Sequence, residues 1–168
     1  MGTDIHAYVI NRKTGEYTQI LGGFRNSNFF NTLQGNCDSN VIYAELPYGA
    51  NRYSFGDLPK AIQDKYREVG GYGLNIMEVS DYIRWFDNTK PHLDAGWCTK
   101  REEWEYKTRD IIPELSYCLS RDDVIEDMSF IEVVDSNSPW LTLSCEIEDV
   151  VDNAKHDHAY VFCYFFDC

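Results

Sequence analysis

The chain has 168 residues, enough for one well-buried core and short for two. Its apolar content of 43% excludes an intrinsically disordered protein. Its net charge of −13 opposes binding to long polyanions, because neutralisation of phosphates supplies most non-specific affinity for nucleic acid. We therefore expect a single domain, residues 1–168, that does not bind duplex nucleic acid. A small anionic ligand, held by a few local Arg, Lys and N–H groups, remains compatible with this charge.

The sequence favours a cytoplasmic protein. It contains no run of about 18–20 apolar residues that would cross a membrane, and its first residues lack the basic and apolar regions of a signal peptide. None of the cysteines forms a Cys-x-x-Cys pair, which argues against a zinc ribbon or a thioredoxin-like motif. We expect reduced thiols that pack as small core residues. The six cysteines are Cys37, Cys98, Cys118, Cys145, Cys163 and Cys168.

The first third of the chain predicts a β-hairpin, a helix and a long loop. Two strand patterns, 3–10 and 17–21, flank a turn at Thr14-Gly15, where glycine supplies a positive φ. Residues 24–33 have aromatic and apolar residues near helical spacing and predict a short helix. Residues 35–56 have no sustained period and predict a loop, and loops of this length are usually functional or mobile.

The middle of the chain predicts mainly helices. Asp57 is expected to cap a helix that carries Pro59 in its first turn and ends at Gly70-Gly71. Its expected buried face is Leu58, Ile62, Tyr66 and Val69. The further expected elements are a helix at 81–86 capped by Ser80, a loop at 91–96, a helix at 100–112 that Pro113 breaks, and a continuation of that helix at 114–119.

The last third predicts three strands, at 130–134, 140–147 and 159–166. The last of them is apolar or aromatic on both faces, so it belongs in the centre of a sheet that is covered on both sides. Its expected neighbour is the N-terminal strand, which is also apolar on both faces. These patterns predict an α+β fold with a mostly antiparallel sheet, adjacent terminal strands and several short helices packed on it.

Asp4, His6 and Asp167 form one candidate site. Asp4 and His6 lie two positions apart in a strand and therefore point to one face, and Asp167 ends the strand expected beside them. The favoured interpretation is a His–Asp hydrogen bond that joins the two terminal strands. The alternatives are ligand binding, and a divalent metal site or acid–base catalysis as in a metal-dependent phosphodiesterase.

Other catalytic patterns are absent from the sequence. His156 and His158 flank one residue and suggest a solvated turn, because a third metal ligand would have to come from far away. Neither His6 nor His158 is followed two positions on by Thr or Ser, so the paired His-x-Thr/Ser arrangement is missing. No Gly-x-Ser-x-Gly, Walker-A or Gly-x-Gly-x-x-Gly loop occurs. We expect no catalytic residue, no metal and no cofactor, and hence a protein that is not an enzyme.

A second candidate site combines donors and aromatic residues between residues 25 and 55. Guanidinium and amide groups suit a phosphate or a base edge, and aromatic side chains stack on nucleobases. For Arg25 and Asn26 the alternative is a solvent-facing arginine and a helix cap. The residues of the long loop are equally consistent with a satellite hydrophobic cluster or a subunit interface. The expected ligand-binding residues are Arg25, Asn26, Asn28, Tyr48, Arg52, Tyr53 and Phe55.

Short motifs at both ends resemble a known group of proteins. The segment Met1–Val9 resembles the "MGCDIH" start of a group of small phage and bacterial proteins, in which an Arg-Asn pair, a Leu-Pro segment and a terminal "FWFDN" strand follow. Here Arg25-Asn26, Leu58-Pro59 and Tyr164–Cys168 stand in the same order. Thr3 replaces the Cys of that pattern and Cys168 its final Asn, which weakens the idea that these two positions hold a metal.

The resemblance implies a phage anti-defence protein. The chain is similar in size and type to the phage anti-CBASS sponges, which sequester cyclic dinucleotides such as 3′,3′-cGAMP without cleaving them. Such a protein would act in the cytoplasm of the host bacterium, as a homo-oligomer such as a tetramer with pockets shared between subunits. An acidic inhibitor that acts by protein–protein contact is the remaining alternative.

Overall fold

A computed structural model describes residues 4–21, 52–116, 127–151 and 159–167. The helix predicted at 24–33, most of the loop predicted at 35–56 and the histidines of 156–158 lie outside these ranges. The chain divides into two compact units. The larger unit joins Met1–Lys90 to Pro139–Cys168, and the smaller unit is Pro91–Ser138.

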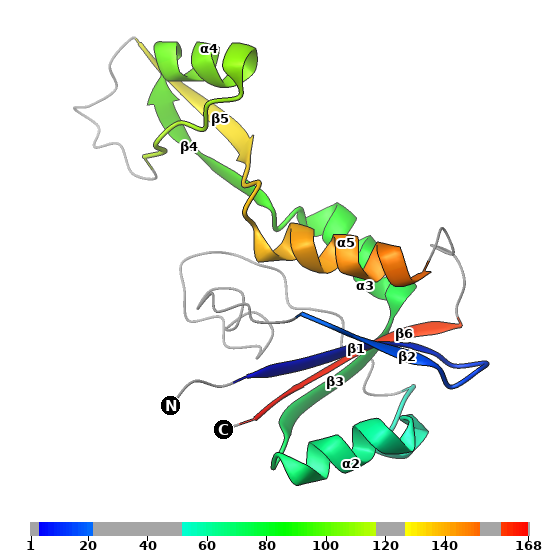
Figure 1. Cartoon of the computed structure of the whole chain (residues 1–168). Coiled ribbons are helices and arrows are strands. Elements are labelled where there is room, and N and C mark those ends of the chain that lie inside the picture. Colours follow the sequence, from blue (N-terminus) through cyan, green and yellow to red (C-terminus); the bar gives the residue numbers. More distant parts are fainter. Residues whose placement is uncertain (1–3, 22–51, 117–126, 152–158, 168) are drawn as a thin grey trace. The chain divides into compact units, whose positions relative to one another are not determined.

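The larger unit is built on a four-stranded antiparallel sheet in the order β2-β1-β6-β3 (Figure 1). Its strands are β1 (Ile5–Asn11), β2 (Tyr17–Ile20), β3 (Tyr72–Glu78) and β6 (Tyr160–Phe166). β1 and β6 pair along their whole length, from Ile5 opposite Phe166 to Asn11 opposite Tyr160. The predicted α+β class and the predicted adjacency of the terminal strands are confirmed.

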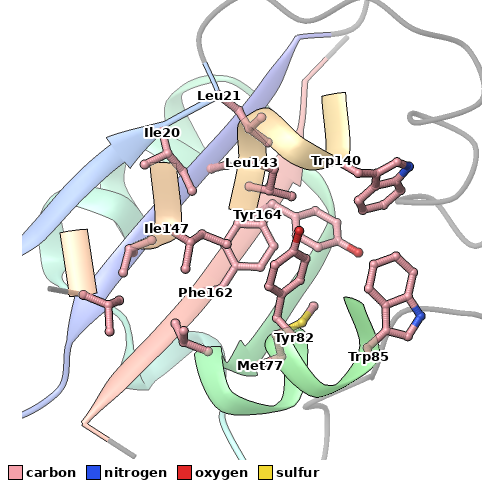
Figure 2. Packing of buried hydrophobic residues seen from close by; sticks show 14 of the residues in the cluster. Ile20, Leu21, Met77, Tyr82, Trp85, Trp140, Leu143, Ile147, Phe162 and Tyr164 are labelled. Atoms are coloured by element: carbon pink, nitrogen blue, oxygen red, sulfur yellow. The ribbon is translucent and has the colours of Figure 1, made fainter. Parts of the chain in front are cut away.

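Helices cover both faces of this sheet, as its central strand requires. In Figure 1, α3 (Val79–Thr89) and α5 (Pro139–Val151) lie on one face and α2 (Lys60–Glu68) on the other. β6 alternates between the two: Phe162 and Tyr164 pack in the α3/α5 core, shown in Figure 2, whereas Cys163 and Phe165 pack with α2. Every residue of Val161–Phe166 is buried. Burial also raises the pKa of the Cys163 thiol to about 12, so it stays protonated and acts as an apolar core group.

The hairpin between β1 and β2 forms as predicted. Gly15 has φ +76°, the left-handed conformation that glycine adopts without a steric penalty. The side chain of Asn11 accepts hydrogen bonds from the backbone N–H groups of Lys13 and Thr14, at 2.9 and 3.3 Å. These local contacts close the turn and set the register of β2 against β1.

The predicted start of α2 was wrong, because a short 3-10 helix precedes α2. Asp57 does not cap α2; it ends a 3-10 helix, η1 (Phe55–Asp57), and its carboxylate accepts a hydrogen bond from the Ser54 N–H at 2.7 Å. Pro59 is the N-cap residue of α2. The predicted helix itself is confirmed, with Leu58 and Ile62 buried against the sheet. The local Ser–Asp capping pair prevails over a cap on the following helix because Leu58, which is extended, and Pro59, which is not helical, separate the two.

β3 is the strand that the sequence did not reveal. It contains Gly73 and Asn75, which interrupt any regular apolar alternation, and its pairing with β6 shifts register between Tyr72 and Asn75. Gly73 has φ +63°, and a Cβ there would lie 2.7 Å from the Phe166 ring. Glycine is therefore required where β3 bends past β6. The helix predicted at 81–86 exists, but it begins at Val79 directly after the strand and Glu78, not Ser80, is its N-cap residue.

The strand predicted at 140–147 was wrong, because this segment lies within helix α5. Its buried residues Trp140, Leu143, Ile147 and Val151 follow helical spacing of three and four. Over a short window, Leu141 and Leu143 also fit an alternating pattern, and eight residues do not separate the two periods. Packing against the sheet selects the helix, since it buries one continuous apolar stripe.

The smaller unit consists of β4 (Leu93–Thr99), α4 (Lys100–Arg109) and β5 (Met128–Val134), with β4 and β5 antiparallel. The strand predicted at 130–134 and a helix from residue 100 are confirmed. The loop predicted at 91–96 was wrong, since β4 runs through it, and residues 114–116 do not continue α4: Ser116 pairs with Trp97 as an isolated bridge. α4 ends because Asp110 takes a left-handed conformation, before Pro113 is reached.

None of the helices in the described ranges has the length and apolar character needed to cross a membrane.

Candidate functional site

Of the cluster predicted at the chain termini, His6 and Asp167 form a hydrogen-bonded link between the two terminal strands, and Asp4 joins it through its backbone N–H. The Nε2 atom of His6 and the Oδ2 atom of Asp167 lie 2.9 Å apart, and the Asp4 backbone N–H donates to Oδ1 of the same carboxylate at 2.9 Å. The His6 ring stacks on Phe165 at a centroid distance of 5.0 Å. Hydrogen bonds from His6 and then from the Asp4 N–H lower the pKa of Asp167 below its usual value.

This geometry supports the structural interpretation of the terminal cluster. Both oxygens of the Asp167 carboxylate already accept hydrogen bonds from the chain itself. Within the part of the chain that the structure describes, no group of three His, Cys, Asp or Glu residues is arranged to hold a metal ion. The arrangement can join the first and last strands, and it engages Nε2 of His6 and both oxygens of Asp167 in doing so.

We expect His6→Ala to lower the free energy of unfolding by about 1–3 kcal/mol, because it leaves a partly buried carboxylate short of a donor. The side chains of His6 and Asp167 are only 13% and 19% exposed. The loss in free energy of unfolding caused by Asp167→Asn should become smaller as the pH falls below about 3.8, the ordinary pKa of Asp. A carboxylate with a lowered pKa in the folded protein contributes stability only while it is ionised.

Urea unfolding at pH 7 and at pH 3, followed by circular dichroism, measures both effects. Asp149→Asn, the same substitution at an exposed position of α5, is the matched control and should change the free energy of unfolding at pH 7 by no more than about 0.5 kcal/mol. A His6→Ala protein as stable as the wild type would contradict the structural role.

A cavity of about 320 Å³ lies at one end of the sheet, on the side that α2 covers. Its walls come from β1 and its turn, from the segment around η1, from β3 and from β6. Side chains of the three strands form an apolar floor, and polar groups stand at the rim. The lining residues are Ile10, Asn11, Arg12, Gly15, Tyr53, Asp57, Leu58, Pro59, Ile76 and Val161.

Tyr53 is held in this wall by charged groups on both sides. Its hydroxyl donates to Oε1 of Glu78 at 2.9 Å and accepts from Nη1 of Arg12 at 3.0 Å. The Arg12 guanidinium carbon lies 4.6 Å from the centroid of the Tyr53 ring, a cation–π contact. Burial, followed by the hydrogen bond to Glu78, raises the pKa of Tyr53. The phenol therefore remains a neutral donor, and its ring is fixed in orientation.

The two charged residues that line the cavity, Asp57 and Arg12, differ in how far they are already bound by other groups of the chain. The Asp57 carboxylate is engaged by the N–H and the hydroxyl of Ser54, at 2.7 and 3.0 Å, which lowers its pKa. Arg12 makes one side-chain hydrogen bond, to a neutral phenol, and in the described ranges no carboxylate lies within ion-pair distance of it. A guanidinium has five N–H donors, so Arg12 can still donate to a ligand.

The sequence-predicted ligand residues are only partly brought together here. Tyr53 lines the cavity. Arg52 is not among its lining residues; it lies 3.6 Å from Glu78 and 3.7 Å from Asp81, with its side chain 64% exposed. Phe55 packs elsewhere, against Tyr66 with ring centroids 5.2 Å apart. The remaining predicted residues, Arg25, Asn26, Asn28 and Tyr48, lie outside the described residues.

Sequence reasoning missed Arg12 and Glu78. Arg12 follows directly after β1 in a turn, where a solvated arginine is ordinary, and Glu78 ends a strand that had not been recognised. No spacing in the sequence connects either of them to Tyr53, which is 41 residues from Arg12. One signal was available: both residues stand at strand ends, where side chains can line the edge of a sheet.

The comparisons with known proteins add no family. No family model matches the sequence, and no curated protein or solved structure matches it.

Proposed function

We propose that this chain binds a nucleotide-type ligand in the Arg12/Tyr53 cavity and retains it without chemical conversion. The observation that carries the proposal is the cavity itself, in which an oriented aromatic ring and an arginine without a carboxylate partner in the described residues stand over an apolar floor. An apolar lining with a few fixed polar groups is the usual composition of a small-molecule site.

The floor and the rim suit different parts of such a ligand. Ile10, Ile76 and Val161 offer flat apolar contact to a base, and the Arg12 guanidinium offers charged donors to a phosphate. Small-molecule sites have volumes of about 300–1000 Å³, so a cavity of about 320 Å³ fits one nucleotide unit better than a whole cyclic dinucleotide.

The absence of a nucleophile–base pair supports retention instead of cleavage. In the described wall of the cavity, Asp57 is the sole carboxylate and there is no His or Cys. That carboxylate is tied to Ser54 by two hydrogen bonds. Acid–base catalysis needs a group that can exchange a proton with the ligand, and a carboxylate with a lowered pKa is a weak base.

In its more specific form, the proposal is a phage anti-CBASS sponge for a cyclic dinucleotide such as 3′,3′-cGAMP, acting in the host cytoplasm. The resemblance of the two termini supports this form. One cavity would hold one nucleotide half, and a second copy of the chain would hold the other, which is why a homo-oligomer is part of the proposal. The phosphodiesterase alternative has less support, because Nε2 of His6 and both oxygens of Asp167 are already engaged in hydrogen bonds within the chain.

We expect Arg12→Ala to weaken nucleotide binding by about 10- to 100-fold, because it removes charge-assisted hydrogen bonds to phosphate. Tyr53→Ala should cost about 5- to 150-fold, the usual effect of losing one stacked aromatic residue. Isothermal titration calorimetry against mononucleotides and a panel of cyclic dinucleotides measures both. Arg67→Ala is the matched control, since Arg67 also lies over an aromatic ring, that of Phe55, but outside the cavity.

Heating the complex to release the bound compound, followed by chromatography of that compound, then distinguishes the classes of function. A sponge returns the intact ligand, whereas a phosphodiesterase returns its product. If no nucleotide binds the wild type at micromolar concentration, the proposal fails. If binding occurs but Arg12→Ala and Arg67→Ala behave alike, the ligand binds elsewhere on the chain.

A further inference from the structure

The two-stranded sheet of the smaller unit has one exposed apolar face. Antiparallel pairing places Trp97 opposite Phe130 and Leu93 opposite Val134 on this face, with the rings of Trp97 and Phe130 in edge contact at 5.4 Å. Phe130 is 58% exposed and Val134 is 41% exposed. Large apolar side chains gathered on one face are a common mark of an interaction site.

The opposite face of the same sheet is covered. Cys98 and Val133, which point to that side, are 1% and 2% exposed. A Cβ on Gly96 would lie 2.9 Å from the Leu115 side chain, so the segment after α4 packs directly on β4. Ser116 also pairs with Trp97 and thereby occupies the outer edge of β4. The covered face and the occupied edge leave β5 as the exposed side of this sheet.

The outer edge of β5 has backbone groups that no strand of the described ranges pairs. The Asp135 N–H donates to the His92 carbonyl, which shows that odd-numbered residues of β5 direct their backbone groups toward β4. Those of Phe130 and Glu132 therefore point away from β4. The Val134 N–H, which has the same direction, is already bonded to the Tyr106 hydroxyl at 3.1 Å. Within the described ranges, no other strand pairs with this edge.

Glu132 gives this face a charge that the described residues do not neutralise. It lies opposite Ala95, between Phe130 and Val134 along β5. Glu103 and Glu105 of α4 differ in this respect, since Glu105 pairs with Arg101 at 3.1 Å and Glu103 pairs with Lys107. No described Lys or Arg lies within ion-pair distance of Glu132. An occupant of this face therefore has to bring a cation as well as an apolar side chain.

We propose that β5 receives an extended segment of a partner protein, added antiparallel as a third strand of this sheet. Residues directly opposite each other in such a pair share a face. The segment would place Lys or Arg opposite Glu132 and, two residues later, a large apolar residue opposite Phe130. Strand addition of this kind combines main-chain hydrogen bonds with side-chain specificity.

A second copy of the chain is a poorer occupant. Two-fold pairing of β5 with itself about Ile131 places Glu132 opposite Phe130, so neither glutamate meets a cation. Each copy also carries a net charge of −13, which opposes association. This inference stands independently of the nucleotide site, which lies in the other unit.

The test uses the full chain and a blocked heptapeptide of threonine and valine that contains Lys-x-Phe, with a second peptide in which glutamate replaces the lysine. NMR titration should move the amide signals of Phe130 and Glu132, and the lysine peptide should bind about 3- to 10-fold more tightly than the glutamate peptide. For the Glu132→Lys variant, the glutamate peptide should bind more tightly than the lysine peptide. Glu114→Lys, an equal charge change at another exposed position of the smaller unit, should leave the preference for the lysine peptide unchanged.

Three results would overturn the proposal. The first is that neither peptide moves the Phe130 and Glu132 signals at millimolar concentration. The second is that a peptide with methylated backbone nitrogens, which cannot pair with an edge strand, binds equally well. The third is that sedimentation shows self-association that Phe130→Ser abolishes, which would assign this face to a second copy of the chain.

Discussion

Replacing Phe162 with alanine is expected to lower the free energy of unfolding of the larger unit by about 3–5 kcal/mol. Phe162 is fully buried in β6, and its ring centroid lies 5.6 Å from that of Tyr82 and 5.5 Å from that of Tyr164. Figure 2 shows it enclosed between the sheet and the helices that cover this face. Close-packed neighbours relax only partly into the space left by the ring, so a cavity adds to the loss of apolar burial.

Denaturant unfolding followed by circular dichroism measures this loss. Tyr17→Ala is the control in the same sheet, because Tyr17 is 45% exposed on the edge strand β2 and should cost less than about 1 kcal/mol. Equal losses for the two variants would show that the core is not centred on β6.

Cys145→Pro is expected to cost about 3 kcal/mol or more, because proline inside a helix removes a backbone hydrogen bond and its ring clashes with the preceding turn. Cys145 is an exposed free cysteine in the middle of α5. Its side chain makes no contribution to the core, so the effect isolates the backbone conformation. The same unfolding measurement records it.

Cys145→Ala is the matched control and should change the free energy of unfolding by no more than about 0.5 kcal/mol, since alanine favours a helix. Comparable stability of the proline and alanine variants would contradict the helical conformation of 139–151. It would instead support the strand that the sequence pattern predicts for 140–147.

The candidate cavity could be predicted only in small part. Tyr53 was recognised as an aromatic residue suited to stacking, and it does line the cavity. Arg12, which supplies the charge, and Glu78, which orients the ring, gave no local signal. Their contribution depends on the pairing of β1, β6 and β3, which brings residues from distant parts of the chain to one end of the sheet.

The terminal strands and their pairing were determined by the sequence itself. An eight-residue run that is apolar on both faces can be buried only at the centre of a covered sheet, and the N-terminal strand was the other run with this property. Gly15 marked the hairpin turn for an equally local reason, its positive φ. The Asp4, His6 and Asp167 cluster then followed from the register of two strands that could be recognised in advance.

Tertiary structure decided the elements in which local patterns were short or interrupted. Residues 140–147 fit two periods, and burial of Trp140, Leu143 and Ile147 on one stripe selects the helix. β3 contains a glycine in a left-handed conformation and an asparagine buried beside Tyr164, neither of which favours a strand by itself. β3 is a strand because β6 presents it with a row of backbone donors and acceptors, and buried groups of that kind must be paired.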